Sequence, residues 1–323
     1  MKNFKMALLA MVLVVTSVLL AMVLVVTSVL FAACSNKEEE KKADAKTEER
    51  TVKHAKGEIK IPANPKKIAD LSGSTEELLI FGMKPIITAN TSQEKIDAHI
   101  ANKLKDVKPV GSAWGDKINI EAVAAAKPDL ILVNNRQEKI YDQLSKIAPT
   151  VMLNTPLDQW RPKFEEVGQI LGKEKETKEW FKKYDEKASK LHDKIIAKTG
   201  DATFMKMAAY PNAFRVYGDY GYGSVIFNDL KLPAVKGTPT DKPLVQVQKE
   251  ALIDYNPDYL FVFTTGDGSQ RLKEFQEESI WKNMNAVKNN HVFTIKNEDL
   301  NKGYFPLGKE MILDEVAEFV LGK

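Results

Sequence analysis

The stretch EKETKEWFKKYDEKASKLHDKIIAK, residues 174–198, decides the fold that this sequence predicts. It contains neither glycine nor proline, and its apolar residues recur every three or four positions, as on the buried stripe of an amphipathic α-helix. A helix of this length extends roughly 35 Å, about the width of a small domain. We therefore expect a stiff connecting helix whose stripe consists of Trp180, Tyr184, Ala188, Leu191 and Ile195.

Two similar segments flank this helix. EAVAAAKPDLILV covers residues 121–133 and EALIDYNPDYLFV covers residues 250–262, with Glu-Ala, Pro-Asp and the final valine in register. Each copy is typical of a short helix, a Pro-Asp turn and a buried strand. The duplication predicts an α/β fold of two Rossmann-like lobes joined by one long α-helix, with a ligand cleft between the lobes. A length of 323 residues suits two domains of ~100–150 residues.

The sequence divides into five parts on this interpretation. We expect a signal peptide over residues 1–34 and a flexible charged tether over 35–55. The amino-terminal lobe covers 56–160, connecting helices that include the long one cover 161–199, and the carboxyl-terminal lobe covers 200–323.

The amino-terminal segment has the features of a secretory signal. Lys2 and Lys5 precede an apolar run from Met6 to Ala33, and a charged stretch follows. Cys34 is the only cysteine, so it forms no disulfide within the chain. Its position after Phe-Ala-Ala resembles a bacterial lipobox, in which the cysteine is lipidated and becomes the mature amino terminus.

An uncleaved anchor is the alternative for this segment. AMVLVVTSVL occurs at 10–19 and again at 21–30, and an apolar run of ~20 residues suffices to span a bilayer. Both alternatives place the folded part outside the cytoplasmic membrane.

Composition excludes one class of partner. The chain is 44% hydrophobic and 28% charged with a net charge of +3, as in ordinary globular proteins. Lysine and glutamate alternate along the predicted helices, and no basic block is interleaved with aromatic residues. We therefore expect no nucleic-acid binding.

Aromatic and cationic residues gather where predicted strands end, which is where open α/β sheets bind ligands. The densest group, residues 210–222, holds four tyrosines and one arginine. Some of these rings can equally be core residues, and Arg136 can be a cap or an ion-pair partner. We expect the ligand to contact Trp114, Arg136, Tyr210, Arg215, Tyr217, Tyr220, Trp281 and Tyr304.

Enzymatic and metal-site motifs are missing from the sequence. The four histidines are scattered without metal-ligand spacing, and neither a Gly-x-Ser-x-Gly elbow nor a phosphate-binding loop occurs. We expect no catalytic residue, no metal bound directly by the protein and no covalent cofactor. Haem ligation by histidine or methionine stays open.

Three segments carry a family resemblance. TEELLIFGMKP at 75–85, NIEAVAAAKPDLIL at 119–132 and WKNMNAVK at 281–288, together with the lipobox-like start, resemble the ferric-siderophore substrate-binding lipoproteins of ABC importers. The resemblance implies two α/β lobes that close little and deliver the ligand to a membrane permease. It implies a lipid-anchored protein, which we expect to be a monomer, on the extracytoplasmic face of the cell membrane.

The resemblance also implies one acidic docking residue per lobe for arginines of the permease. Glu76 matches this position in the amino-terminal lobe, and Asp229 is our expectation for the carboxyl-terminal lobe, although the family usually has glutamate there.

The ligand class follows from charge. A ferric catecholate is strongly anionic and would require two or three cations, whereas a ferric hydroxamate is neutral or weakly cationic. Arg136 and Arg215 are the only clear cations in the predicted cleft, so we expect a hydroxamate siderophore. Catecholate, haem or cobalamin binding are alternatives, as are a siderophore-processing enzyme and a structural surface protein.

Overall fold

The fold is described from a computed structural model over residues 48–92 and 95–322. The predicted signal peptide, Cys34 and most of the predicted tether lie outside these residues. The first sheet has five parallel strands in the order β7-β4-β3-β8-β9. The strands are β3 (Ile68–Asp70), β4 (Ile87–Thr88), β7 (Lys108–Pro109), β8 (Leu130–Val133) and β9 (Thr150–Met152).

A second five-stranded sheet forms the other lobe, in the order β12-β11-β10-β13-β14. Its last three strands are parallel, while β11 is antiparallel to both of its neighbours. The strands are β10 (Phe204–Ala209), β11 (Phe214–Tyr217), β12 (Leu244–Val247), β13 (Tyr259–Thr264) and β14 (Val292–Thr294). The predicted fold class of two α/β lobes is confirmed.

Short helices accompany both sheets. Those of the amino-terminal lobe are α2 (Thr75–Ile80), α3 (Ala98–Ala101), α4 (Ile120–Ala126), η1 (Asn135–Ile140), α5 (Tyr141–Ser145) and α6 (Trp160–Leu171). The helices that follow β11 in the chain are α8 (Tyr222–Ser224), η2 (Val225–Asp229), η3 (Lys249–Asp254), α9 (Gly268–Glu277), α10 (Ser279–Asn283), α11 (Asn285–Lys288), η4 (Asn297–Tyr304) and α12 (Pro306–Leu321). Strands β5 (Thr91–Ser92) and β6 (Lys95–Ile96) form a small separate ribbon.

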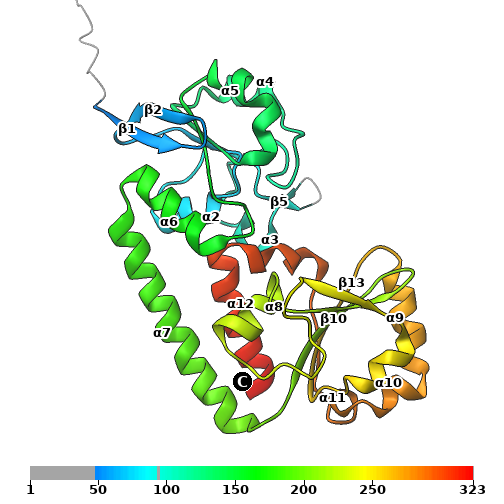
Figure 1. Ribbon diagram of the computed structural model, residues 1–323. Coiled ribbons are helices and arrows are strands. Elements are labelled where there is room, and N and C mark those ends of the chain that lie inside the picture. The colour runs from blue at the N-terminus through cyan, green and yellow to red at the C-terminus, as the bar shows by residue number, and fades with distance from the viewer. Residues whose placement is uncertain (1–47, 93–94, 323) are drawn as a thin grey trace, which may run out of the picture. The chain divides into compact units, whose positions relative to one another are not determined.

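The predicted connecting helix is present as α7 (Glu174–Thr199), one continuous helix of 26 residues between α6 and β10 (Figure 1). Tyr184, Ala188 and Ile195 of its stripe are buried, and Trp180 and Leu191 pack against the same core. In the first half of α7, the Tyr184 ring meets the Trp160 ring of α6 at 5.3 Å between centroids. Tyr184 and Ile195 both belong to the core of the second lobe, so Tyr184 connects that core to α6.

The predicted tether ends earlier than expected. Strand β1 (Glu49–His54) pairs with β2 (Gly57–Pro62), so residues 49–54 are not tether. Val52 is buried with Ile61 in one core, and His54 Nδ1 accepts a hydrogen bond of 3.1 Å from the Met152 amide. Exposed charged residues alternate with these buried ones, so the high charge of the segment predicted a tether although it forms a half-buried strand.

The segment before the last helix packs into the first lobe. Gly303 and Tyr304 end η4, and Phe305 after them is buried in the core of the amino-terminal lobe with Leu71 and Leu157. The chain thus returns from the second sheet to pack its terminal segment into the first lobe.

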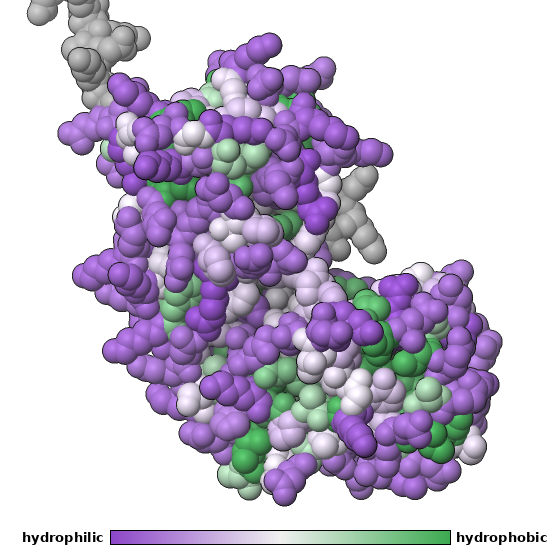
Figure 2. Space-filling view, in the orientation of Figure 1, coloured by the Kyte–Doolittle hydropathy of each residue, from purple (hydrophilic) through white to green (hydrophobic). Residues whose placement is uncertain are grey.

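The visible surface is mostly hydrophilic, with larger apolar patches over the carboxyl-terminal lobe (Figure 2). Across residues 48–92 and 95–322, none of the helices combines the length and the apolar character that crossing a membrane requires.

Candidate functional site

Trp114 lies on the loop that follows β7, and Arg136 lies in the first turn of η1, directly after β8. The Asn134 side chain, just after β8, donates hydrogen bonds of 3.0 Å to the carbonyls of Ala113 and Ser72. Gln137 donates to the Gly115 carbonyl at 2.6 Å. These bonds join the loop of Trp114 to the start of η1, and the Arg136 guanidinium lies 5.6 Å from the Trp114 ring centroid, within cation–π range.

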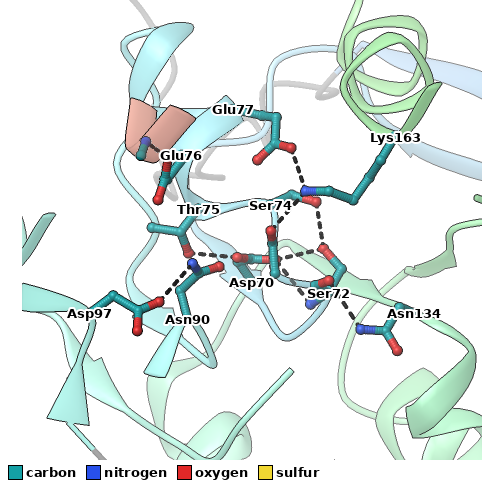
Figure 3. A network of polar contacts seen from close by, with 12 residues as sticks. Asp70, Ser72, Ser74, Thr75, Glu76, Glu77, Asn90, Asp97, Asn134 and Lys163 are labelled. Atoms are coloured by element: carbon teal, nitrogen blue, oxygen red, sulfur yellow. Dashed lines mark hydrogen bonds and ion pairs between the residues drawn. The ribbon is translucent and has the colours of Figure 1, made fainter. Parts of the chain in front are cut away.

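Asn134 also contacts a buried polar network around the turn between β3 and α2 (Figure 3). Asp70 ends β3 and accepts hydrogen bonds from the Ser72 amide at 3.0 Å, the Ser72 hydroxyl at 2.7 Å and the Thr75 hydroxyl at 2.5 Å. Lys163 of α6 donates to the Gly73 carbonyl at 2.9 Å and pairs with Glu77. Because buried polar groups are stabilised only when they are paired, this network fixes the turn between β3 and α2.

Tyr304 links the two lobes at the site. Its ring lies edge-on to Trp114 at 4.9 Å and to Tyr220 at 5.2 Å between centroids. Gly221 allows this approach, because its φ is +54° and a Cβ there would lie 3.0 Å from the Tyr304 ring. Burial and the Tyr220 hydroxyl raise the pKa of Tyr304, so its hydroxyl is neutral.

The carboxyl-terminal lobe contributes one face of its sheet. Arg215 of β11 lies 3.7 Å from the Tyr210 ring centroid, and the Tyr210 and Tyr217 hydroxyls are 3.0 Å apart. Burial and the bond to Tyr210 raise the pKa of Tyr217, so this hydroxyl is neutral too. Lys206 of β10 lies 4.5 Å from the Tyr217 ring centroid and donates to the Tyr220 carbonyl at 3.3 Å.

Seven of the eight predicted ligand residues therefore lie in one continuous series of contacts. From the first lobe to the second the series is Arg136, Trp114, Tyr304, Tyr220, Lys206, Tyr217, Tyr210 and Arg215. The series contains aromatic rings in edge-to-face contact, cationic side chains and the neutral hydroxyls of Tyr217 and Tyr304. The arrangement can bind a ligand that has both flat and oxygen-rich surfaces.

Trp281 is the exception and is a correction to the predicted set. It is 6% exposed and packs against Phe275 in a core that also contains Met205 and Met207. Those methionines alternate along β10 with Phe204 and Ala208, whose core contains Tyr217. Trp281 therefore packs on the opposite face of the sheet from the site.

Lys206 is the residue that the sequence interpretation missed. A signal was present, because a single lysine interrupts the apolar run FMKMAA of β10. Burial lowers the pKa of Lys206 to about 7. The side chain belongs to the same sheet face as Tyr217 and so, in its protonated form, adds a third cation to the site.

Both predicted docking carboxylates have partners within the protein, and Glu76 is buried while Asp229 is half-buried. Glu76 is fully buried, 2.5 Å from His99 Nε2 and 2.9 Å from the Gly308 amide. Asp229 accepts hydrogen bonds from the Tyr184 hydroxyl at 2.7 Å and from Lys309 at 3.1 Å. Glu76 is therefore corrected as a surface residue, because it is fully buried. The docking role of Asp229 stays a prediction, although its carboxylate already has two partners within the protein.

The model of one protein family matches most of the described chain. Its description is periplasmic binding protein, and the match covers residues 72–298. The chain belongs to this family.

In the part of the chain that the structure describes, no three histidine, cysteine or acidic side chains gather as a metal site.

Similar proteins of this family are binding proteins for iron complexes. The chain is 32% identical to an iron(3+)-hydroxamate-binding protein YxeB of Bacillus subtilis over 86% of this chain and 87% of the relative. It is also 32% identical to the iron(3+)-hydroxamate-binding protein FhuD of Bacillus subtilis over 81% and 84%. The solved structure of Staphylococcus aureus SirA complexed with staphyloferrin B is 31% identical with a TM-score of 0.69, covering 84% of this chain and 98% of SirA.

Membership of the family decides between the function classes left open by the sequence. These relatives are binding proteins, so the enzyme and structural-protein alternatives are set aside. The protein is a substrate-binding protein rather than a catalyst. No covalent cofactor is implied, since an iron complex is what the names of these relatives describe as bound.

Proposed function

We propose that this protein captures a ferric siderophore outside the cytoplasmic membrane and delivers it to an ABC permease. The observation that carries the proposal is the series of rings and cations from Arg136 to Arg215, drawn from both lobes. Ferric siderophores present flat chelating groups and polarised oxygens around the iron. Aromatic faces and cationic donors are the groups that bind such a surface.

Two ligand classes are candidates. A hydroxamate siderophore is the class that the sequence predicts from two cations, and the names of the relatives YxeB and FhuD support it. An anionic ferric complex is the second candidate, and one specific observation favours it: Lys206 adds a third cation to the site.

Titration of the purified full-length protein in detergent tests the proposal. Ferrioxamine B, ferrichrome, ferric citrate and a ferric catecholate are added in turn while tryptophan fluorescence and heat are recorded. We expect sub-micromolar binding of at least one complex, with quenching that depends on Trp114. Haem and cobalamin serve as competitors of a different chemistry, and binding of either one alone would overturn the assignment.

The duplicated segments offer docking carboxylates that are more exposed than Glu76 and Asp229. Glu121 and Glu250 occupy the same position in the two copies, each in the first turn of its helix, and both are exposed. Within the described residues, no ion pair involves either one. Ala124 and Ile253, one turn later, are exposed as well, and Ile253 is 59% exposed. We assign these matched surfaces, one per lobe, to the permease.

Anchoring through a lipid on Cys34 is part of the same proposal. The apolar run before it and the charged residues after it support a lipoprotein, with the uncleaved anchor as the alternative. Metabolic labelling with a radioactive fatty acid tests it. Cys34→Ala should abolish the label, and persistence of membrane attachment in that variant would favour the uncleaved anchor. Gel filtration with light scattering tests the expected monomer.

A further inference from the structure

Four lysines are buried in the described part of the chain, and three of them have a carboxylate partner. Lys163 pairs with Glu77, Lys309 with Asp229 at 3.1 Å, and Lys302 with Glu315 at 2.6 Å and Asp299 at 2.8 Å. Charges that leave water are stabilised in this way by an opposite charge. Each of these three pairs is satisfied within the protein.

Lys206 is the fourth, and within the described residues it has no such partner. It is 4% exposed, and its ammonium group donates one long hydrogen bond of 3.3 Å to the Tyr220 carbonyl. The rings of Tyr217 and Phe263 lie 4.5 Å and 5.4 Å away. An ammonium group has three hydrogen-bond donors, and here only one of them has an oxygen acceptor, while the other neighbours are ring faces.

The neighbouring groups supply no negative charge. Tyr217 of β11 is neutral, Tyr220 contributes its carbonyl, and Phe263 of β13 and Gly223 of α8 are apolar. Arg215, the next charged group on this sheet face, is itself cationic, and its buried Nε has no hydrogen-bond partner in the described chain. Two cations on one face of a sheet thus lack a counter-charge.

We propose that Lys206 binds an anionic oxygen of the ligand, and that the ligand is therefore a ferric complex with net negative charge, such as a carboxylate or catecholate chelate. The inference rests on the proposed siderophore binding and selects the second of its two ligand classes. Arg215 and Arg136 complete a set of three cations around the complex. Such a set offsets the desolvation of an anion, whereas a neutral hydroxamate complex would leave Lys206 uncompensated.

The side chain's acid–base behaviour adds a measurable signature. With its pKa lowered to about 7 by burial, Lys206 is largely deprotonated in the free protein at pH 8.5. An anion next to it favours the charged form, so ligand binding takes up a proton there. The affinity should then fall as pH rises from about 6.5 to 9.

Lys206→Met tests the proposal, with Lys309→Met as the matched buried lysine whose partner is Asp229. Calorimetry in buffers of different ionisation enthalpy gives affinity and proton uptake for ferric citrate, ferric enterobactin, ferrichrome and ferrioxamine B. We expect wild type to prefer the anionic complexes, and Lys206→Met to weaken them by at least about tenfold and to abolish the proton uptake. Lys309→Met should keep both affinity and proton uptake.

Thermal unfolding of the free protein separates a binding role from a structural one. Lys206→Met should raise Tm, because an uncompensated charge is replaced by an apolar chain, whereas Lys309→Met should lower Tm. Preference of wild type for the hydroxamates, or unchanged anion affinity in Lys206→Met, would overturn this inference and leave siderophore binding standing. Failure of wild type to bind any of the four complexes would overturn the proposed function itself.

Discussion

The Glu76 carboxylate accepts a hydrogen bond of 2.9 Å from the backbone amide of Gly308, 232 residues further along the chain. Its second oxygen lies 2.5 Å from His99 Nε2. Nearby, Asn301 donates to Asp97 at 3.0 Å. These contacts join α2 and α3 of the amino-terminal lobe to the segment that follows the second sheet, so they hold the lobes together beside the site.

Glu76→Ala should therefore destabilise the protein. It removes a buried charged acceptor and leaves the Gly308 amide unpaired, which costs about 2–4 kcal/mol of unfolding free energy. Glu76→Gln keeps an oxygen for Gly308 and should lose less. Urea unfolding measures both variants, with exposed Glu179→Ala as the control. A Glu76→Ala variant as stable as the control would show that the contact does not hold the lobes together.

Titration of His99 should contribute to the pH dependence of the unfolding free energy. Burial opposes its charged form, but the hydrogen bond and charge of Glu76 and the charge of Asp97 outweigh burial and nearby Lys302, so the pKa of His99 is raised above its usual value. A raised folded-state pKa stabilises the fold at pH below about 6.5, and this contribution is lost as pH rises through the folded-state pKa.

The variant His99→Asn isolates the contribution of His99 to the unfolding free energy. The difference in unfolding free energy between wild type and His99→Asn should be larger at pH 5.5 than at pH 8.5. Comparing the two proteins cancels titrations that they share, including that of Lys206. A difference that is constant, or that grows with pH, would contradict the assignment.

Lys163→Met should be among the most destabilising single substitutions. It leaves the fully buried Glu77 without its cation, and breaking such a pair costs about 3–5 kcal/mol. The double variant Lys163→Met with Glu77→Gln should recover part of the loss, because the remaining side chain is uncharged. Denaturant unfolding of the two single variants and the double variant measures the coupling. Additive losses would show that the pair is not coupled.

The sequence predicted the elements that periodicity defines. The stripe on α7 and the repeat of helix, turn and strand depend on local spacing, and both appear in the structure. Strand β1 was missed because its pairing with β2 and the burial of Val52 are tertiary effects. The charged composition of residues 49–54 alone predicts a flexible tether there.

The site was predicted less completely, for a physical reason. Sequence does not show which face of β10 Lys206 occupies, so Lys206 was omitted. It also does not show which face of the sheet α10 covers, so Trp281 was included although it packs on the face opposite the site. Glu76 looks like a surface acid at a helix start, since its partner Gly308 is distant in sequence. Trp114 and Arg136 were predicted to lie together because the fold class brings the carboxyl ends of parallel strands to one edge, and the structure places them in contact.

Arg215→Ala and Trp281→Phe should separate binding from packing. The Arg215 guanidinium stacks on the Tyr210 ring and has no carboxylate partner in the described chain. Arg215→Ala should therefore weaken ligand binding by about tenfold or more and change the unfolding free energy little. Trp281→Phe should lower the unfolding free energy by about 1–3 kcal/mol and leave affinity within about twofold. Calorimetry and urea unfolding are run on both variants. The reverse pattern would remove Arg215 from the site.

Glu121→Lys with Glu250→Lys should block transport without affecting capture. Both carboxylates are exposed at matched positions of the repeat, and neither belongs to the series of site residues, so ligand affinity should be unchanged. Iron uptake by cells that carry the double variant should fall to the level of a strain lacking the protein, because like charges then face the arginines expected on the permease. Each single variant should retain intermediate uptake, since one lobe still docks. Glu186→Lys on the exposed side of α7 is the control for each single variant, because it makes the same change of charge on another surface. Normal uptake by the double variant, with the protein present at wild-type levels, would mean that the permease contacts another surface.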